Sequence, residues 1–233
     1  MLITALTKLT LLDFPGRLAC IIFTGGCNLR CGYCHNAEFV LPERMAALGE
    51  GLPFETVKKF LASRKGMLDG VVICGGEPTL QLDLMEKLRE IKEMGFAVKL
   101  DTNGSNPVAL KKIIEAGLVD FVAMDVKDAL PYRKELVGVT IGEAAIRESI
   151  RLIKESGLDY EFRTTVWPEY HGVEVLRKIG MEIVGAKNWY LQKGRRGKTL
   201  AEKFGAGEEF NEYELKSLAE ELEGYADRME IRI

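Results

Sequence analysis

The sequence predicts an α/β protein in which six parallel strands form a partial, TIM-like (β/α)6 barrel. Three observations lead to this prediction. Short apolar runs alternate with segments of helical period, several runs are apolar almost throughout, and glycines follow the expected helix ends. Continuously apolar strands are typical of parallel sheets covered on both faces, and right-handed crossovers curl such a sheet into an open or partial barrel.

The expected strands are rich in Val, Ile, Phe and Tyr, and each is followed by a segment of helical period. The six strands cover residues 18–24, 70–74, 96–101, 119–125, 160–166 and 187–192. The helices cover residues 54–64, 82–94, 107–116, 142–156, 173–184 and 211–223, and a short strand at 229–233 follows the last one. Two helix starts have capping-box spacing, Thr140 with Glu143 and Asn211 with Glu214.

The chain has 233 residues, and we expect one domain over residues 1–233. Its core should cover about residues 18–192, and residues 193–233 should add a loop and a helix. The stretch 193–209 is basic and then glycine-rich, which predicts a mobile loop that could help admit a partner.

Charge and hydropathy exclude several classes of protein. The 32 Lys and Arg against 35 Asp and Glu give a net charge of −3, which argues against a nucleic-acid binder. The N-terminal leucines are interrupted by Lys8 and Asp13, which is not the pattern of a signal peptide. Because no window of ~18 residues is uninterruptedly apolar, we expect no membrane span and a cytoplasmic location.

The five cysteines divide into a motif and two strand residues, Cys20 and Cys74. Cys27, Cys31 and Cys34 have the spacing C-x3-C-x2-C. Three thiolates can hold three corners of a [4Fe–4S] cluster and leave one iron open for a substrate. A Cys3His zinc site and redox thiols are the alternatives, although His35 directly follows Cys34, a poor arrangement for binding one ion together.

Polar or glycine-rich residues follow each expected strand, which predicts one active site at the carboxyl ends of the strands. Their positions are 25–36, 75–78, 101–104, 125–127, 163–165 and 192. The other histidine, His171, is expected on a surface loop, and we assign it no role.

Together these motifs resemble the radical S-adenosylmethionine (SAM) superfamily. The resemblance is carried by C-x3-C-x2-C with Tyr33 before the third cysteine, and by GGEP one strand later. DFPG at 13–16, the motif at 24–36, DTNG at 101–104 and DVK at 125–127 are similar to glycyl-radical-enzyme activases. Within these, the pattern is most similar to the anaerobic ribonucleoside-triphosphate reductase activating proteins, with pyruvate formate-lyase activating enzyme a near relative.

The resemblance implies roles for the motif residues. SAM would bind the open iron, Tyr33 would lie among the cofactor contacts, and Gly75 and Gly76 would let the backbone approach SAM closely. Glu77 would accept from the SAM ammonium. The alternative for GGEP is a plain turn before a helix.

Two further motifs are implied to complete the SAM site. Asp101, Thr102 and Asn103 would contact SAM or a nearby cation, or else form an Asx-turn. Lys127 would meet the SAM carboxylate, and Arg163 would face a polar barrel interior rather than solvent. Asp125 with Asp101 could hold a monovalent cation, or Asp125 and Lys127 could be a simple surface pair.

The activity implied is reductive cleavage of SAM to a 5′-deoxyadenosyl radical, which generates a glycyl radical on a partner enzyme. The expected partner is anaerobic ribonucleotide reductase, and the expected electron donor is a flavodoxin or ferredoxin. A pyruvate formate-lyase-like partner, a small-molecule or peptide substrate, and a non-catalytic electron-transfer or zinc module are the alternatives. We expect no nucleic-acid or membrane partner.

Overall fold

The computed structural model describes residues 1–47 and 49–233 and confirms the α/β class. The strand order follows the chain; β1 pairs antiparallel with β2, and the pairings β2–β3, β3–β4, β6–β7 and β7–β8 are parallel. The strands are β1 Ile3–Thr10, β2 Ala19–Thr24, β3 Gly70–Gly75, β4 Ala97–Thr102, β5 Phe121–Asp125, β6 Asp159–Val166, β7 Ala186–Lys193 and β8 Ala226–Arg232.

The helices include the six that were expected and three short ones that were not. They are α1 Pro42–Ala46, α2 Phe54–Ala62, α3 Leu84–Glu93, α4 Pro107–Glu115, α5 Lys134–Val137, α6 Glu143–Glu155, α7 Val173–Ile183, α8 Glu202–Ala206 and α9 Glu212–Glu221. No helix in the part of the chain that the structure describes is long and apolar enough to cross a bilayer.

The chain forms two compact units. Unit 1 comprises Met1–Asn28, Asn36–Thr102 and Val108–Val122, and unit 2 comprises Leu29–His35, Asn103–Pro107 and Ala123–Ile233. The organisation as one domain stays a prediction.

In unit 1, β2, β3 and β4 are parallel neighbours, and β1 pairs antiparallel with β2. Helix α3 buries Leu84, Leu88 and Ile91, which share one face because they are spaced by four and three residues. Burying each such side chain stabilises the fold by about 2 kcal/mol. The register places Thr24 beside Gly75, so the loops that carry Cys27 and Glu77 leave the sheet at the same edge.

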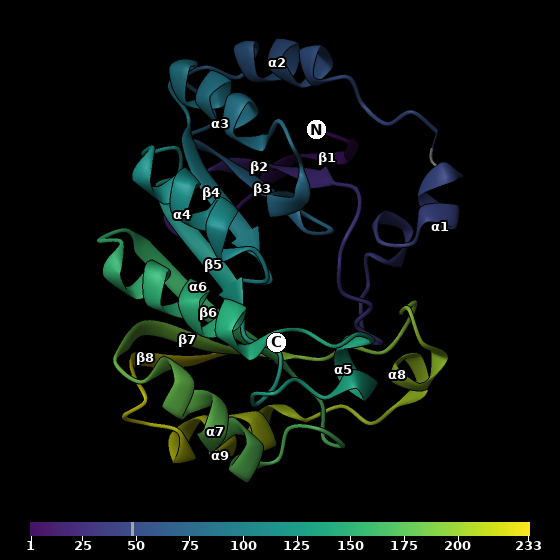
Figure 1. Ribbon diagram of the computed structural model, residues 1–233, viewed down its shortest axis with the longest axis vertical. Coiled ribbons are helices and arrows are strands. Elements are labelled where there is room, and N and C mark those ends of the chain that lie inside the picture. The colour runs from purple at the N-terminus through teal and green to yellow at the C-terminus, as the bar shows by residue number, and fades with distance from the viewer. Residues whose placement is uncertain (48) are drawn as a thin grey trace. The chain divides into compact units, whose positions relative to one another are not determined.

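In unit 2, β6, β7 and β8 are parallel neighbours, and α9 packs on β7 and β8 (Figure 1). The core includes Phe162 and Trp189, whose Nε1 donates to Thr164 Oγ1 at 3.0 Å. Helix α9 has the predicted capping box of Asn211 and Glu214. The second predicted box is wrong, because α6 begins at Glu143 and its N-cap is Gly142 rather than Thr140.

Candidate functional site

A glycine turn in unit 1 lies beside the residues that lead into Cys27. Gly76 N–H donates to Thr24 O and Glu77 N–H donates to Gly26 O, both at 2.8 Å. A Cβ on Gly76 would lie 2.0 Å from Gly26 O, so only glycine allows the two backbone segments to approach this closely. The GGEP turn therefore sets the course of the chain immediately before the first cysteine.

Glu77 is fully buried at the end of this turn. Its Oε1 accepts hydrogen bonds from Thr79 N at 3.1 Å, from Thr79 Oγ1, and from Thr102 Oγ1 at 2.8 Å. A buried carboxylate is tolerated when several donors surround it. The predicted residues Glu77 and Thr102 thus come together, although 25 residues separate them.

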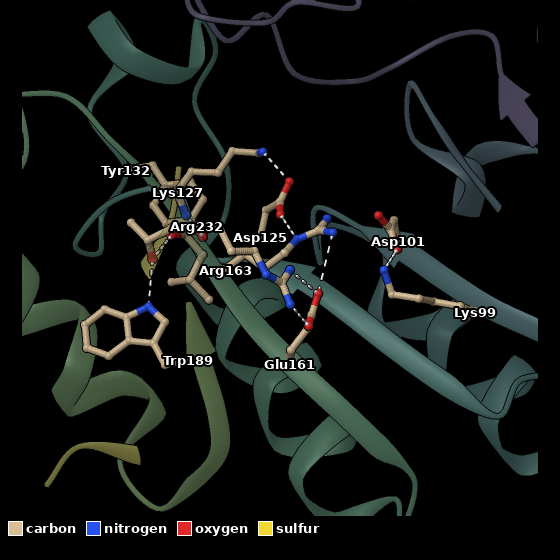
Figure 2. A network of polar contacts seen from close by, with 11 residues as sticks. Lys99, Asp101, Asp125, Lys127, Tyr132, Glu161, Arg163, Trp189 and Arg232 are labelled. Carbon is tan, nitrogen blue, oxygen red and sulfur yellow. Dashed lines mark hydrogen bonds and ion pairs between the residues drawn. The ribbon is translucent and has the colours of Figure 1, made fainter. Parts of the chain in front are cut away.

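Asp101 forms an ion pair with Lys99, whose Nζ lies 2.8 Å from Oδ1 (Figure 2). Lys99 is almost completely buried on β4, and we did not predict a role for it. The signal was present in the sequence, since residues two apart on a strand share a face and Lys99 interrupts an apolar run.

In unit 2, the turn that carries Cys31 and Cys34 has no regular secondary structure and is fixed by backbone hydrogen bonds. Arg30 N–H donates to Val137 O at 2.9 Å, and Gly32 N–H donates to Leu136 O at 3.0 Å. Cys31 is buried and Cys34 is half-buried. Burial raises the pKa of the Cys31 thiol, and the positive charge of Lys127 opposes this rise.

The chemistry of this donor set fits an iron–sulfur cluster. None of the five cysteines forms a disulfide, so the sulfur atoms of Cys27, Cys31 and Cys34 remain available as ligands. Within residues 1–47 and 49–233, no three His, Cys, Asp or Glu side chains are already arranged as a metal site. As ligands, the thiols would lose their protons when metal binds.

Tyr33 is buried between these cysteines, and its Oη has no hydrogen-bond partner within the described chain. Lys127 Nζ lies 5.9 Å from the centre of the Tyr33 ring. An unsatisfied buried hydroxyl is uncommon and indicates a position where a bound group could supply the missing partner. Such a group is what the C-x3-C-x2-C motif with an internal aromatic residue leads us to expect.

Asp125 at the end of β5 has two cationic partners (Figure 2). Arg163 Nε lies 2.8 Å from Oδ1, and Lys127 Nζ lies 3.0 Å from Oδ2. Burial alone would raise the pKa of Asp125, but the charges of Arg163 and Lys127 hold it well below its usual range. Burial would likewise lower the pKa of Lys127, but the Asp125 carboxylate keeps it well above its ordinary value. Asp125 and Lys127 therefore form an ionised pair at neutral pH.

The network continues through Glu161 and Arg232, for which we predicted no role. Glu161 is 1% exposed, and its carboxylate accepts from Arg232 Nη1 at 2.9 Å and Nη2 at 2.6 Å (Figure 2). Arg163 Nη1 lies 3.8 Å from the same carboxylate. Because Glu161 and Arg163 are two residues apart on β6, their shared face was a usable signal, whereas the contribution of Arg232 from β8 was not.

His171 corrects an expectation, because it is fully buried and not on the surface. Its Nδ1 accepts from Trp167 N at 3.1 Å, and its Nε2 lies 3.0 Å from Lys127 O. Lys127 N–H donates to Tyr132 Oη at 3.2 Å. The backbone of Lys127 is thus fixed on both sides, and burial lowers the pKa of His171.

The predicted residues accordingly form two groups. Unit 1 holds Cys27, Gly75, Gly76, Glu77, Asp101 and Thr102, and unit 2 holds Cys31, Tyr33, Cys34, Asn103, Asp125, Lys127 and Arg163. Asn103 makes the Asx-type turn that was the alternative for it, since its Oδ1 accepts from Ser105 N at 2.9 Å. Arg163 contacts Asp125 and Glu161, and its place in a barrel interior stays a prediction.

Three related proteins are similar to this chain over different lengths. A Methanocaldococcus jannaschii protein, provisionally named a glycyl-radical enzyme activating enzyme, is 32% identical over 99% of this chain and 95% of its own length. The 7-carboxy-7-deazaguanine synthase of Thermococcus kodakarensis is 30% identical over 61% of each chain. The pyruvate formate-lyase-activating enzyme of Staphylococcus aureus is 41% identical over 39% of this chain and 37% of its own.

Solved structures share the fold. Streptococcus suis SuiB bound to S-adenosylmethionine gives a TM-score of 0.66 at 14% identity, over 91% of this chain and 52% of that one. A domain of pyruvate-formate lyase-activating enzyme from Bacteroides vulgatus gives 0.55 at 15% identity, over 69% of this chain and 98% of that domain. The Radical SAM superfamily matches residues 21–177. The chain is therefore an enzyme of the radical SAM superfamily, in the same family as the Methanocaldococcus jannaschii relative that it matches over 99% of its length.

Proposed function

We propose that this enzyme holds a [4Fe–4S] cluster through Cys27, Cys31 and Cys34 and uses SAM to generate a glycyl radical on a partner enzyme. The observation that carries the proposal is the match to the activase relative over 99% of this chain. The proposed partner is an anaerobic ribonucleoside-triphosphate reductase, because the motifs DFPG, DTNG and DVK most resemble its activating proteins. A flavodoxin or ferredoxin in the cytoplasm is the proposed electron donor.

When bound and reduced, the cluster supplies the electron that splits SAM into methionine and the 5′-deoxyadenosyl radical that takes a hydrogen atom from a glycine Cα. The protein's part is to bind and orient SAM. Glu77 would accept from the SAM ammonium, and its existing donors Thr79 and Thr102 hold its carboxylate still. Lys127 would meet the SAM carboxylate, with its position fixed by Asp125 and its backbone by His171 and Tyr132.

A monovalent cation at Asp101 or Asp125 is a further part of the proposal. Each carboxylate already has a cationic partner, Lys99 in one case and Arg163 with Lys127 in the other. Dependence of SAM affinity on potassium or sodium at constant ionic strength would support a cation, and an unchanged affinity would contradict it.

The experiment that tests the function is anaerobic reconstitution with iron and sulfide, followed by dithionite, SAM and a candidate anaerobic reductase. The expected result is a glycyl-radical doublet in the electron paramagnetic resonance spectrum of the partner. Variants C27A, C31A and C34A should each lose both the cluster and SAM cleavage. C20A is the matched control, because Cys20 is a buried strand cysteine and should keep the cluster.

A second candidate is action on a small molecule, which the match to a 7-carboxy-7-deazaguanine synthase over 61% of the chain favours. It predicts SAM cleavage without a glycyl radical on any partner, and consumption of a free substrate. That outcome would overturn the activase proposal and leave the cluster and SAM assignments in place.

A further inference from the structure

The segment 198–204, which we call the clamp segment, lies against the turn that carries Cys31 and Cys34. Ala201 N–H donates to Gly32 O at 2.8 Å, and Leu200 N–H donates to Cys34 O at 3.1 Å. Lys198 O lies 3.2 Å from Nδ1 of His35. The sequence suggested only an irregular loop here, whereas the structure places helix α8 and a run of hydrogen bonds in it.

Phe204 fixes the clamp segment to the turn by packing. Its side chain is 2% exposed and is the centre of an aromatic group. The ring centroid lies 5.8 Å from that of Tyr33 and 5.3 Å from those of Trp167 and Tyr170. Edge-to-face and stacked aromatic pairs at these distances are attractive beyond the area they bury.

Gly32 makes this packing possible. A Cβ on Gly32 would lie 2.3 Å from Cε2 of Phe204, so the ring lies directly against the Gly32 backbone. Gly32 does not have a positive φ, which means that glycine is required here for space and not for backbone conformation. The Phe204 ring therefore occupies the space that a side chain at position 32 would need.

The turn is held from its other side by α5, through Arg30 and Gly32 N–H. With α5 on one side and the clamp segment on the other, the backbone between Cys31 and Cys34 has little freedom. We propose that Phe204 is a positioning residue for the iron–sulfur site, which holds the Cys31–Cys34 turn ready for its metal and slows the loss of iron. This inference rests on the cluster-binding part of the proposed function and is independent of the partner.

The test measures the rate of iron loss from the reconstituted protein to a chelator, followed by the decay of the cluster absorbance. F204A should lose iron at least about tenfold faster than the unaltered enzyme. The contacts that are lost when a buried Phe is truncated are worth about two to three times the free energy of a tenfold change in rate. F204L should recover most of the retention. F162A is the matched control, since Phe162 is a buried unit 2 phenylalanine whose ring contacts Tyr160.

A double-mutant cycle separates positioning from general destabilisation. G32A should also speed iron loss, because its methyl group meets the Phe204 ring, and G32A/F204A should lose iron more slowly than the product of the two single effects predicts. The proposal would be overturned if the double variant loses iron at the rate given by the product of the two single effects. It would also be overturned if F204A loses iron no faster than F162A. If F204A does not fold, G32A still tests the contact with the Phe204 ring, and F204L should lose iron faster than F162L by a smaller factor than that expected for F204A. Failure of the unaltered chain to take up iron would overturn the proposed function itself.

Discussion

Arg163 donates from Nε to Oδ1 of Asp125 at 2.8 Å, joining two residues that are 38 positions apart in the sequence. The second oxygen of Asp125 accepts from Lys127. The Asp125 carboxylate thus bonds to both cations and helps to fix where their charges lie (Figure 2). Any anionic group that binds at this place meets an arrangement that is already ordered.

Asp125→Asn should remove the carboxylate that pairs with Lys127 at 3.0 Å and with Arg163 Nε at 2.8 Å, and leave Arg163 with the longer 3.8 Å contact to Glu161. We expect the free energy of unfolding to fall by about 2 kcal/mol, between the values for exposed and buried ion pairs, and SAM affinity to fall at least about tenfold. Urea unfolding and calorimetric titration with SAM measure the two effects. D159N is the matched control, because Asp159 is 82% exposed and its ion pair with Lys187 is long, at 3.9 Å. Equal losses of stability and of SAM affinity in the two variants would contradict the prediction.

Glu77→Gln should separate binding from folding. An amide oxygen can still accept from Thr79 and Thr102, so the unfolding midpoint in urea should change little. Loss of the negative charge should weaken SAM binding about 10- to 100-fold, the amount that a charge-assisted hydrogen bond supplies. T102V should show the opposite pattern, with a loss of about 1 kcal/mol of stability and a smaller loss of affinity. An E77Q variant that binds SAM normally would exclude Glu77 from the SAM site.

Gly76→Ala should disrupt the approach of the GGEP turn to the chain before Cys27. The added Cβ would lie 2.0 Å from Gly26 O, and since backbone rather than a flexible side chain must move, we expect a loss of about 3 kcal/mol or more. Iron content after reconstitution should fall with it. G172A is the control, because a Cβ on Gly172 meets nothing within 4 Å, and equal iron content in both variants would refute the role of Gly76.

His171 should make the stability of the apo-protein depend on pH. Burial lowers its pKa in the folded state, so the unfolded chain binds the proton more readily. The contribution of His171 to stability is then complete above the ordinary pKa of about 6.5 and is lost as the pH falls below it, with a slope of at most about 1.4 kcal/mol per pH unit. H171Q should flatten the urea-unfolding profile between neutral and mildly acidic pH. A slope that survives H171Q would contradict the assignment.

Much of the fold was predictable because its signals are local. The strand expected at 70–74 is β3 Gly70–Gly75, and the helix expected at 173–184 is α7 Val173–Ile183, since each has an apolar pattern of the right period. Strand β1 was missed because its middle residues are exposed and Lys8 interrupts its apolar pattern. It is an antiparallel strand, and it lacks the continuous apolar run by which the other strands were found.

The sequence by itself determined the family, because C-x3-C-x2-C, GGEP and DVK are each contained within a few consecutive residues. Tertiary structure alone decided which groups surround them. It brought Arg232 to Glu161 from 71 positions away, buried His171 beneath Lys127, and set Phe204 against Gly32. Such contacts depend on which strands and loops become neighbours in the folded chain. A local sequence pattern cannot predict these neighbours, because hydrogen bonding and packing depend on distance in space and not on position in the chain.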